Sequence, residues 1–348
     1  MPDKGVVMTM TSRELVTETL EFRNTSHRVP RQLWDLPWAT IHYPQEMQRL
    51  REDFTWDFGG PATSFSAYPP TSGSPAEVGE YVDEWGCTFL NLCQGIIGEV
   101  KEPLVRQEDW SDVDKVTIPE GWLSFDEAMV NRSCAESDLF LFGGCCPRPF
   151  EQLQFIRGTA ELYMDLCDPP KKMLEFMERM HDLYCRLLTK WARTDVDALQ
   201  FMDDWGSQRA LLIHPDLWRK YFGPMYRDYI DIAHRHGKKA FMHSDGYTLA
   251  ILPDLIDMGL DAINTQIFCM GVENLKDFRG KITFWGEIDR QNLLPYATTG
   301  EIDRAVRSVY EALWADGGCI AQCEFGAGAN PANVYQVFQT WSELRRIH

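Results

Sequence analysis

The sequence predicts an α/β protein whose parallel strands close into a (β/α)8 TIM barrel, with an N-terminal helical extension and a hairpin-containing insertion. From residue 139 onward, short apolar runs that end in glycine or polar residues alternate with helical stretches. Strands this apolar are typical of a parallel sheet covered by helices. Together with two earlier runs they make about eight β/α units, which close into a barrel of about 250 residues. An open doubly wound sheet is the alternative, but no glycine-rich nucleotide turn follows the first strand.

The N-terminal part predicts one helix and the first two strands. Thr11–Glu14 has the sequence of a capping box, which predicts a helix over Arg13–Phe22. Val29–Trp34 predicts the first strand. Asp53–Gly60, in which aromatic residues alternate with polar ones, predicts the second strand.

The region from Pro61 to Pro119 is rich in serine, proline and glycine. Short β-like runs at Glu80–Trp85 and Cys87–Leu92 predict a hairpin within it. We interpret the region as an excursion from the barrel, so that the whole chain, 1–348, forms one domain with an insertion at 61–119.

The remaining elements follow as strand and helix pairs. The predicted strands are Leu139–Gly143, Ala198–Met202, Lys239–Met242, Asp261–Asn264, Lys281–Trp285 and Cys319–Gln322. The predicted helices are Pro149–Leu166, Pro170–Thr194, Pro215–His236, Leu249–Met258, Thr299–Ala315 and Asn333–Arg345. Gly237 and Gly259 stand where a helix C-terminus favours glycine.

Composition narrows the class of protein. The chain has 34 Lys plus Arg and 52 Asp plus Glu, a formal net charge of −18, with 44% hydrophobic and 25% charged residues. These shares are typical of a globular protein, and the acidity argues against binding to nucleic acid or to anionic lipid. The chain shows neither a secretory signal nor an apolar run long enough to span a membrane, so we expect a cytoplasmic protein whose ten cysteines are reduced.

Functional groups of a β/α barrel lie at the C-terminal ends of its strands. Polar and ligand-type side chains at the predicted strand ends are Asp57, Cys145, Asp203, Asp204, His243, Asp245, Asn264, Gln266, Glu287, Asp289, Arg290, Cys323 and Glu324. Any one of them could simply mark where polar residues resume after a strand. Most of the set comes from the last five units, which favours a functional site.

His243 and Asp245 are the sharpest local feature. Residues i and i+2 of a strand point the same way, and an imidazole with a carboxylate suits zinc or another first-row metal. Cys323 or Glu324 would supply a further ligand from the last strand, leaving one position open as in a catalytic zinc site. The alternative is a histidine that is hydrogen-bonded to a carboxylate without a metal.

Three acids are candidate catalytic residues, namely Asp203, Asp204 and Glu287. Neighbouring side chains of a strand diverge, so only one of the two adjacent aspartates should face the centre, as a general acid or a ligand to substrate. The alternative is a helix cap. The predicted substrate-binding residues are Trp34, Asn264, Gln266 and Arg290. Arg290 would clamp a carboxylate or offset the surrounding acids.

Several of these residues lie in motifs that resemble the uroporphyrinogen decarboxylase superfamily. The motifs are Met202–Gln208, His243–Gly246, Leu252–Gly259, Phe284–Asp289 and Gly317–Gly326, with Pro215, Pro224, Pro331 and Asn333. The resemblance covers Leu139 to the C-terminus well and the N-terminal third loosely. It implies a β/α barrel, in agreement with the reading from strand and helix pattern.

The resemblance distinguishes two chemistries. True decarboxylases carry an arginine-rich RQAGR segment that grips the acidic substrate, whereas this chain has His27–Trp34, without that motif. Corrinoid-linked methyltransferases typically hold zinc with His-x-Cys after strand 5 and Cys after strand 8. His243 matches the first ligand, Asp245 stands in place of the cysteine, and Glu324, beside Cys323, aligns with the last. An oxygen-richer set suits an oxygen-bound substrate.

We therefore predict a zinc-dependent methyltransferase that moves a methyl group between a small substrate and a corrinoid (cobalamin) on a partner protein. The substrate would be a methoxy compound, a thiol or similar, so that O-demethylation is one form of the reaction. The alternatives are a decarboxylase of another carboxylated substrate, using Arg28 and Arg31, and a non-catalytic tetrapyrrole- or corrinoid-binding protein. A homodimer is compatible with the sequence.

Overall fold

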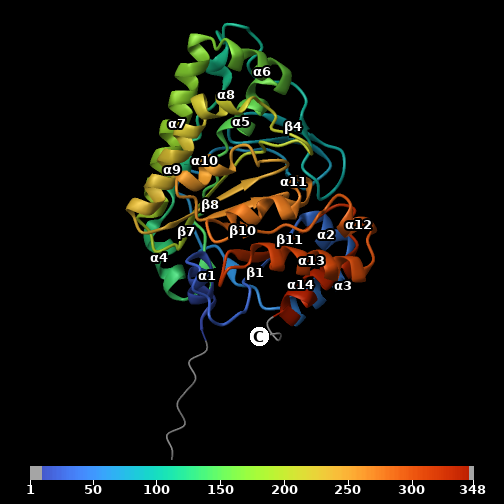
Figure 1. Cartoon of the computed structure of the whole chain (residues 1–348). Helices are drawn as coiled ribbons and strands as arrows, with labels where there is room; N and C mark the ends of the chain where they lie inside the picture. Colours follow the sequence, from blue (N-terminus) through green and yellow to red (C-terminus); the bar gives the residue numbers. More distant parts are fainter. Residues whose placement is uncertain (1–9, 345–348) are drawn as a thin grey trace, which may run out of the picture.

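The computed structural model describes residues 10–344, which form a barrel of parallel strands surrounded by helices (Figure 1). Six strands form one sheet in the order β1-β11-β10-β9-β8-β7, and β2 pairs with β6. The strands are β1 (Arg31–Asp35), β2 (Phe58–Gly59), β6 (Phe140–Leu141), β7 (Ala198–Met202), β8 (Lys239–Ser244), β9 (Ala262–Thr265), β10 (Thr283–Trp285) and β11 (Cys319–Phe325).

Hydrogen bonds close the sheet into a barrel. A parallel bridge joins Phe142 to Ala198 at the β6 side, and Asp57 N donates to Arg31 O at 3.0 Å at the β1 side. The predicted eight-stranded barrel is therefore confirmed within residues 10–344.

Large apolar side chains fill the barrel. Inward-facing residues of the strands form one cluster with the N-terminal helix, namely Val16, Leu20, Phe58, Phe140, Phe142, Ala198, Phe241, Ala262, Trp285 and Ile320. The rings of Phe142 and Phe241 pack edge to face, with centroids 4.9 Å apart. The interior is a packed core and not a pore, and α1 (Ser12–Leu20) closes its N-terminal end through Val16 and Leu20.

The N-terminal predictions are confirmed in one place and wrong in another. Thr11 and Glu14 form the capping box of α1. The predicted second strand is reduced to Phe58–Gly59, because its first residue, Asp53, ends α3 (Pro44–Asp53) and residues 54–57 form an irregular segment. The aromatic residues there pack on a helix: Phe54 and Trp56 contact Phe338 of α14 (Pro331–Leu344), with ring centroids 5.7 and 4.9 Å apart.

The insertion forms a small antiparallel sheet of β3 (Gly79–Val82), β4 (Thr88–Asn91) and β5 (Glu99–Val100). The predicted hairpin is confirmed, and β5 extends it. Buried residues of this region, such as Trp85 and Phe89, belong to the same apolar cluster as the helices around the barrel.

Two predicted long helices are each divided. The first divides into α5 (Pro149–Arg157) and α6 (Thr159–Cys167) at Gly158, whose φ of +89° is left-handed. The second divides into α8 (Pro215–Tyr221) and α9 (Gly223–Arg235) beside Pro224, which lacks the N–H that a continuous helix needs. The predicted end of the last helix, Arg345, lies outside the described residues.

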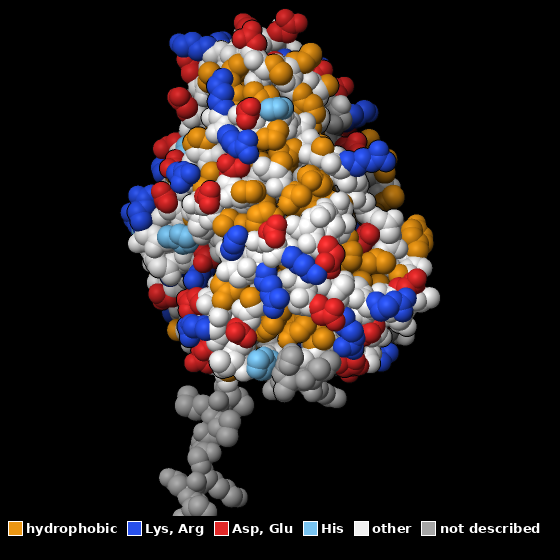
Figure 2. Space-filling model, viewed as in Figure 1, with side chains coloured by type: hydrophobic (Ala, Val, Ile, Leu, Met, Phe, Trp, Pro, Cys, Tyr) orange, Lys and Arg blue, Asp and Glu red, His pale blue; other side chains and the backbone are white. Residues whose placement is uncertain are grey.

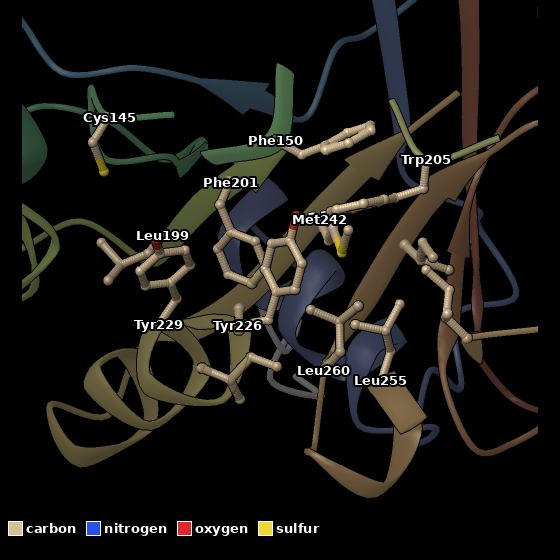
Figure 3. Packing of buried hydrophobic residues seen from close by; sticks show 14 of the residues in the cluster. Cys145, Phe150, Leu199, Phe201, Trp205, Tyr226, Tyr229, Met242, Leu255 and Leu260 are labelled. Atoms are coloured by element: carbon tan, nitrogen blue, oxygen red, sulfur yellow. Dashed lines mark hydrogen bonds between the residues drawn. The ribbon is translucent and has the colours of Figure 1, made fainter. Parts of the chain in front are cut away.

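The other helices complete the outer ring. They are α2 (Pro37–His42), α4 (Glu127–Ala135), α7 (Lys171–Ala192), α10 (Leu252–Asp257), α11 (Ile267–Met270), α12 (Leu293–Tyr296) and α13 (Thr299–Leu313). Figure 3 shows how α9 packs on the barrel, where Tyr226 and Tyr229 meet Phe201 of β7. No helix among residues 10–344 is long and apolar enough to cross a membrane. On the face shown in Figure 2, acidic and basic side chains are interspersed.

The turn of the insertion hairpin holds a buried carboxyl group that makes stability depend on pH. Asp83 Oδ1 accepts from Trp85 N at 3.1 Å and from Cys87 N at 2.7 Å. Burial raises the pKa of Asp83 to about 6, above the value of about 3.9 expected in the unfolded chain. The contribution of Asp83 to the free energy of unfolding is fully present below the unfolded-state pKa. It is lost as the pH rises through the folded-state pKa.

We expect Asp83→Asn, which keeps both hydrogen bonds, to remove this pH dependence. Between pH 4 and pH 7 the wild type should lose about 2–3 kcal/mol of unfolding free energy relative to the variant, measured by urea denaturation. Glu80→Gln, an exposed change on the same hairpin, is the matched control. If the free energy of unfolding changed with pH in the same way in wild type and Asp83→Asn, the raised pKa of Asp83 would be contradicted.

Candidate functional site

The two adjacent aspartates after β7 have different environments. Asp203 is fully buried, and its carboxylate accepts from Phe150 N at 3.0 Å and from Glu151 N at 2.7 Å. The Tyr226 hydroxyl also donates to it. Asp203 therefore caps α5 and ties it to α9, while Asp204, with 37% of its side chain exposed, faces the barrel mouth.

Asp204, His243 and Asp245 meet at the C-terminal end of β7 and β8. His243 Nε2 lies 3.6 Å from Asp204 Oδ1 and 3.6 Å from Asp245 Oδ1. The three residues offer ligand atoms that all lie within 4.8 Å of one another. Asp245 Oδ1 is buried without a hydrogen-bond partner. One nitrogen and two carboxylate oxygens around one point form a donor set suited to a divalent metal.

The tautomer of His243 follows from Asn264. The Asn264 amide nitrogen donates to Trp285 O, so its oxygen is the atom that faces His243 Nδ1 at 2.6 Å. We assign the imidazole proton to Nδ1, which leaves the Nε2 lone pair directed at the two aspartates. Metal-binding histidines commonly have their other nitrogen hydrogen-bonded in this way.

Two of the predicted substrate-binding residues support His243 in the structure. Asn264 fixes the tautomer, as described, and is completely buried. The Trp34 ring packs on His243, with ring centroids 5.1 Å apart. They hold the imidazole between the barrel core and the mouth.

The other two predicted substrate-binding residues, Arg290 and Gln266, lie together among the acidic side chains at the barrel mouth. The Arg290 guanidinium donates to Asp245 and, at 2.8 Å, to Glu324 Oε2, and its Nε lies 3.7 Å from Glu287 Oε1. When the Gln266 amide oxygen faces Arg290, it accepts from Nη2 at 2.9 Å. Arg290 thus offsets the surrounding carboxylates.

Glu287 is a buried acid without hydrogen-bond partners. It is 2% exposed, and neither carboxyl oxygen has a hydrogen bond. Burial, reinforced by the charges of Glu324, Asp289 and Asp204, raises its pKa well above the ordinary value for glutamate. This environment therefore favours the protonated form of Glu287.

Cys323 and Glu324 point to opposite sides of β11, because successive side chains of a strand alternate. Glu324 reaches Arg290 at the mouth. Cys323 is fully buried, and burial, with the nearby acids, raises the pKa of its thiol well above the ordinary value. Within residues 10–344 the group of ligand atoms at the mouth contains Asp204 and neither Cys323 nor Glu324.

A cavity of about 490 Å³ lies beside this centre, on the far side of Arg290, the residue that contacts Asp245. Its floor includes Arg290 and Glu324, and the insertion supplies one wall through Pro75, Ala76, Gly95, Ile96 and Ile97. Sequence reasoning missed these wall residues, because nothing in their local pattern indicates that the insertion folds over the mouth.

Asp57, Arg28 and Arg31 lie at the opposite end of the barrel. The prediction that Asp57 ends a strand is wrong, since Asp57 precedes β2. Its buried carboxylate accepts from Ser12 Oγ at 2.6 Å, from Arg31 N at 2.8 Å and from the Arg28 guanidinium. These groups join α1 to the N-terminal ends of β1 and β2.

Comparison with known proteins agrees with this architecture. Residues 86–344 match the model of the family described as uroporphyrinogen decarboxylase (URO-D). No curated protein matches the chain. A solved methyltransferase from Methanosarcina mazei is 13% identical, with 96% of this chain and 99% of that chain covered and a TM-score of 0.62, which shows a shared fold.

A dihydropteroate synthase from Xanthomonas albilineans, solved with indole-2-carboxylic acid and 6-chloroguanine, is 12% identical. The match covers 50% of this chain and 62% of that chain, and its TM-score of 0.30 is too low to indicate a shared fold.

The division of roles between Asp203 and Asp204 can be tested by stability. Asp203→Ala should lower the free energy of unfolding by about 3 kcal/mol, because two buried backbone N–H groups and the Tyr226 hydroxyl lose their acceptor. Asp204→Ala, the matched control one residue away, should change it by less than about 1 kcal/mol. Urea unfolding of both variants measures this, and equal losses would contradict the assignment.

Proposed function

The chain belongs to the uroporphyrinogen decarboxylase (URO-D) family, and on that premise we propose that it is a metal-dependent methyltransferase. The methyl group would move between a small substrate, such as a methoxy compound or a thiol, and a corrinoid on a partner protein. The observation that carries the proposal is the position of His243 Nε2, which lies 3.6 Å from both Asp204 Oδ1 and Asp245 Oδ1 while Nδ1 meets Asn264 Oδ1.

The donor set fits zinc or a similar divalent metal. For a tetrahedral ion with bonds of about 2.0–2.1 Å, neighbouring nitrogen and oxygen ligands lie roughly 3.4 Å apart, close to the 3.6 Å separations here. Asp245 Oδ1 is a buried acceptor without a hydrogen-bond donor, and a metal ion would satisfy it. We propose His243, Asp204 and Asp245 as ligands. Glu324 would join them only if Arg290 released it.

When bound, the metal supplies Lewis acidity at the heteroatom of the substrate. The chain's own residues would do the rest. Arg290 and Gln266 border a cavity of about 110 Å³ together with Glu287, where they would orient the substrate. With a methoxy donor, a corrinoid on the partner protein would supply the methyl acceptor, and Glu287 would hold the proton that the departing substrate oxygen needs.

The cavity beside the site favours a partner that docks over the mouth. Its walls are largely apolar, with Leu36, Ile96 and Ile97 among them. The corrinoid would approach through this opening, which borders Arg290 and Glu324 at the strand ends.

The geometry weakens the decarboxylase alternative. Arg28 and Arg31 were its candidate carboxylate grips, and both lie beside Asp57 at the end of the barrel away from His243. A decarboxylase would release carbon dioxide without a metal. A non-catalytic binding protein would form a coloured complex with cobalamin and show no turnover.

Substitution of the ligands tests the proposal. His243→Ala, Asp245→Ala and Asp204→Ala should each remove one equivalent of zinc relative to wild type. Methyl transfer from a panel of methoxy compounds and thiols to cobalamin should fall at least about 100-fold. Cys323→Ala is the matched control and should keep both the zinc content and the methyl-transfer activity of the wild type. Unchanged methyl transfer in His243→Ala would refute the metal-dependent mechanism.

Glu287 should behave as an acid that must be protonated. Activity should fall as pH rises through its raised pKa, because only the neutral carboxyl can give a proton. Glu287→Gln should lower kcat about 10²–10⁴-fold for alkyl methyl ethers. The loss should be much smaller for a nitrophenyl methyl ether, whose leaving oxygen needs no proton. An equal loss for both donors would exclude the proposed proton transfer.

A further inference from the structure

A second group of ligand-type side chains lies on the outer wall of the barrel, far from the strand ends. His181 and Cys185 are on α7 and Asp228 is on α9, two helices that run side by side (Figure 1). The ligand atoms of the three residues all lie within 4.8 Å of one another.

Local geometry explains why they meet. His181 and Cys185 are four residues apart, so both side chains lie on one face of α7. The packing of Tyr229 against Tyr184, with ring centroids 6.4 Å apart, holds α9 against that face and places Asp228 opposite His181. His181 Nε2 is 3.0 Å from Asp228 Oδ2, and Cys185 Sγ is 3.5 Å from the same nitrogen.

We propose that His181, Cys185 and Asp228 bind a zinc ion that links α7 to α9, with water as the fourth ligand. Nitrogen, thiolate sulfur and carboxylate oxygen are the ligands that zinc takes in proteins. This site does not rest on the proposed function, and the cluster at the barrel mouth contains no thiol.

The nitrogen–sulfur separation is close to that of a tetrahedral zinc site, whereas the 3.0 Å between His181 Nε2 and Asp228 Oδ2 is a hydrogen-bond distance that would lengthen around an ion. Bonds of about 2.3 Å to sulfur and about 2.0–2.1 Å to nitrogen place these two ligands roughly 3.5 Å apart, and the structure has 3.5 Å. Because Cys185 Sγ is also 3.8 Å from Nδ1, the sulfur lies over the ring. The imidazole must therefore turn about χ2 to direct Nε2 at the ion.

The surroundings suit a cation. Asp228 and Asp182 place negative charge near the thiol and Arg235 opposes it, and burial with these acids raises the pKa of Cys185 to about 12. The metal-free thiol therefore carries a proton, which zinc would displace. The Tyr229 hydroxyl, 3.3 Å from His181 Nδ1, is a partner for the second ring nitrogen of the kind that metal-bound histidines have.

Cobalt substitution of the full chain provides the test. Metal-stripped protein titrated with Co²⁺ should develop a thiolate-to-cobalt charge-transfer band. The band should be lost in Cys185→Ser and reduced in Asp228→Asn, a change at a half-exposed side chain that should not disturb folding. It should persist in His243→Ala, which removes only the site at the mouth.

Cys134→Ser, a buried cysteine on α4, is the matched control and should keep the band. Zinc analysis of His243→Ala should still find one equivalent per chain, which separates this proposal from the proposed function. No band in wild type, a band that survives in Cys185→Ser, or a full band in Asp228→Asn would overturn the site and leave only a His181–Asp228 hydrogen bond.

Discussion

The hydrogen bond between His243 Nδ1 and Asn264 Oδ1 fixes the orientation of the imidazole at the mouth of this barrel. The two residues are register partners on β8 and β9, and Asn264 is in turn held by Trp285 O at the end of β10. Three neighbouring strands therefore fix the imidazole in one tautomer. With the proton on the other nitrogen, Nε2 would offer its N–H to Asp204 and Asp245 and would have no lone pair for a metal.

The packed interior separates two ends with different roles. At one end, Asp57 joins α1 and two strands through Ser12, Arg28 and Arg31, so that its charge stabilises the fold. At the other end, Arg290 is shared among several carboxylates. The acid excess of the chain is thus partly a property of the site.

Hydrogen bonding divides the buried acids by role. Asp203 and Glu287 are both buried at strand ends and both have raised pKa values. Asp203 is satisfied by two backbone N–H groups and a tyrosine hydroxyl, which makes it part of the framework. Glu287 has no such donors. A buried carboxyl without partners costs free energy that a purely structural role would not require.

The sequence by itself determined the order of β/α units and, from β7 onward, the residues that follow each strand, because apolar periodicity and glycine helix stops are local. It did not determine that Asp53 belongs to a helix, or that Gly158 and Pro224 divide two long helices. Only the tertiary structure decided that Asp204, and not Asp203, joins His243, and that Glu324 faces Arg290 while Cys323 is buried. It alone placed the insertion over the mouth and brought Asp228 to His181 and Cys185. These outcomes depend on strand register and helix packing between residues distant in the chain, which no local pattern records.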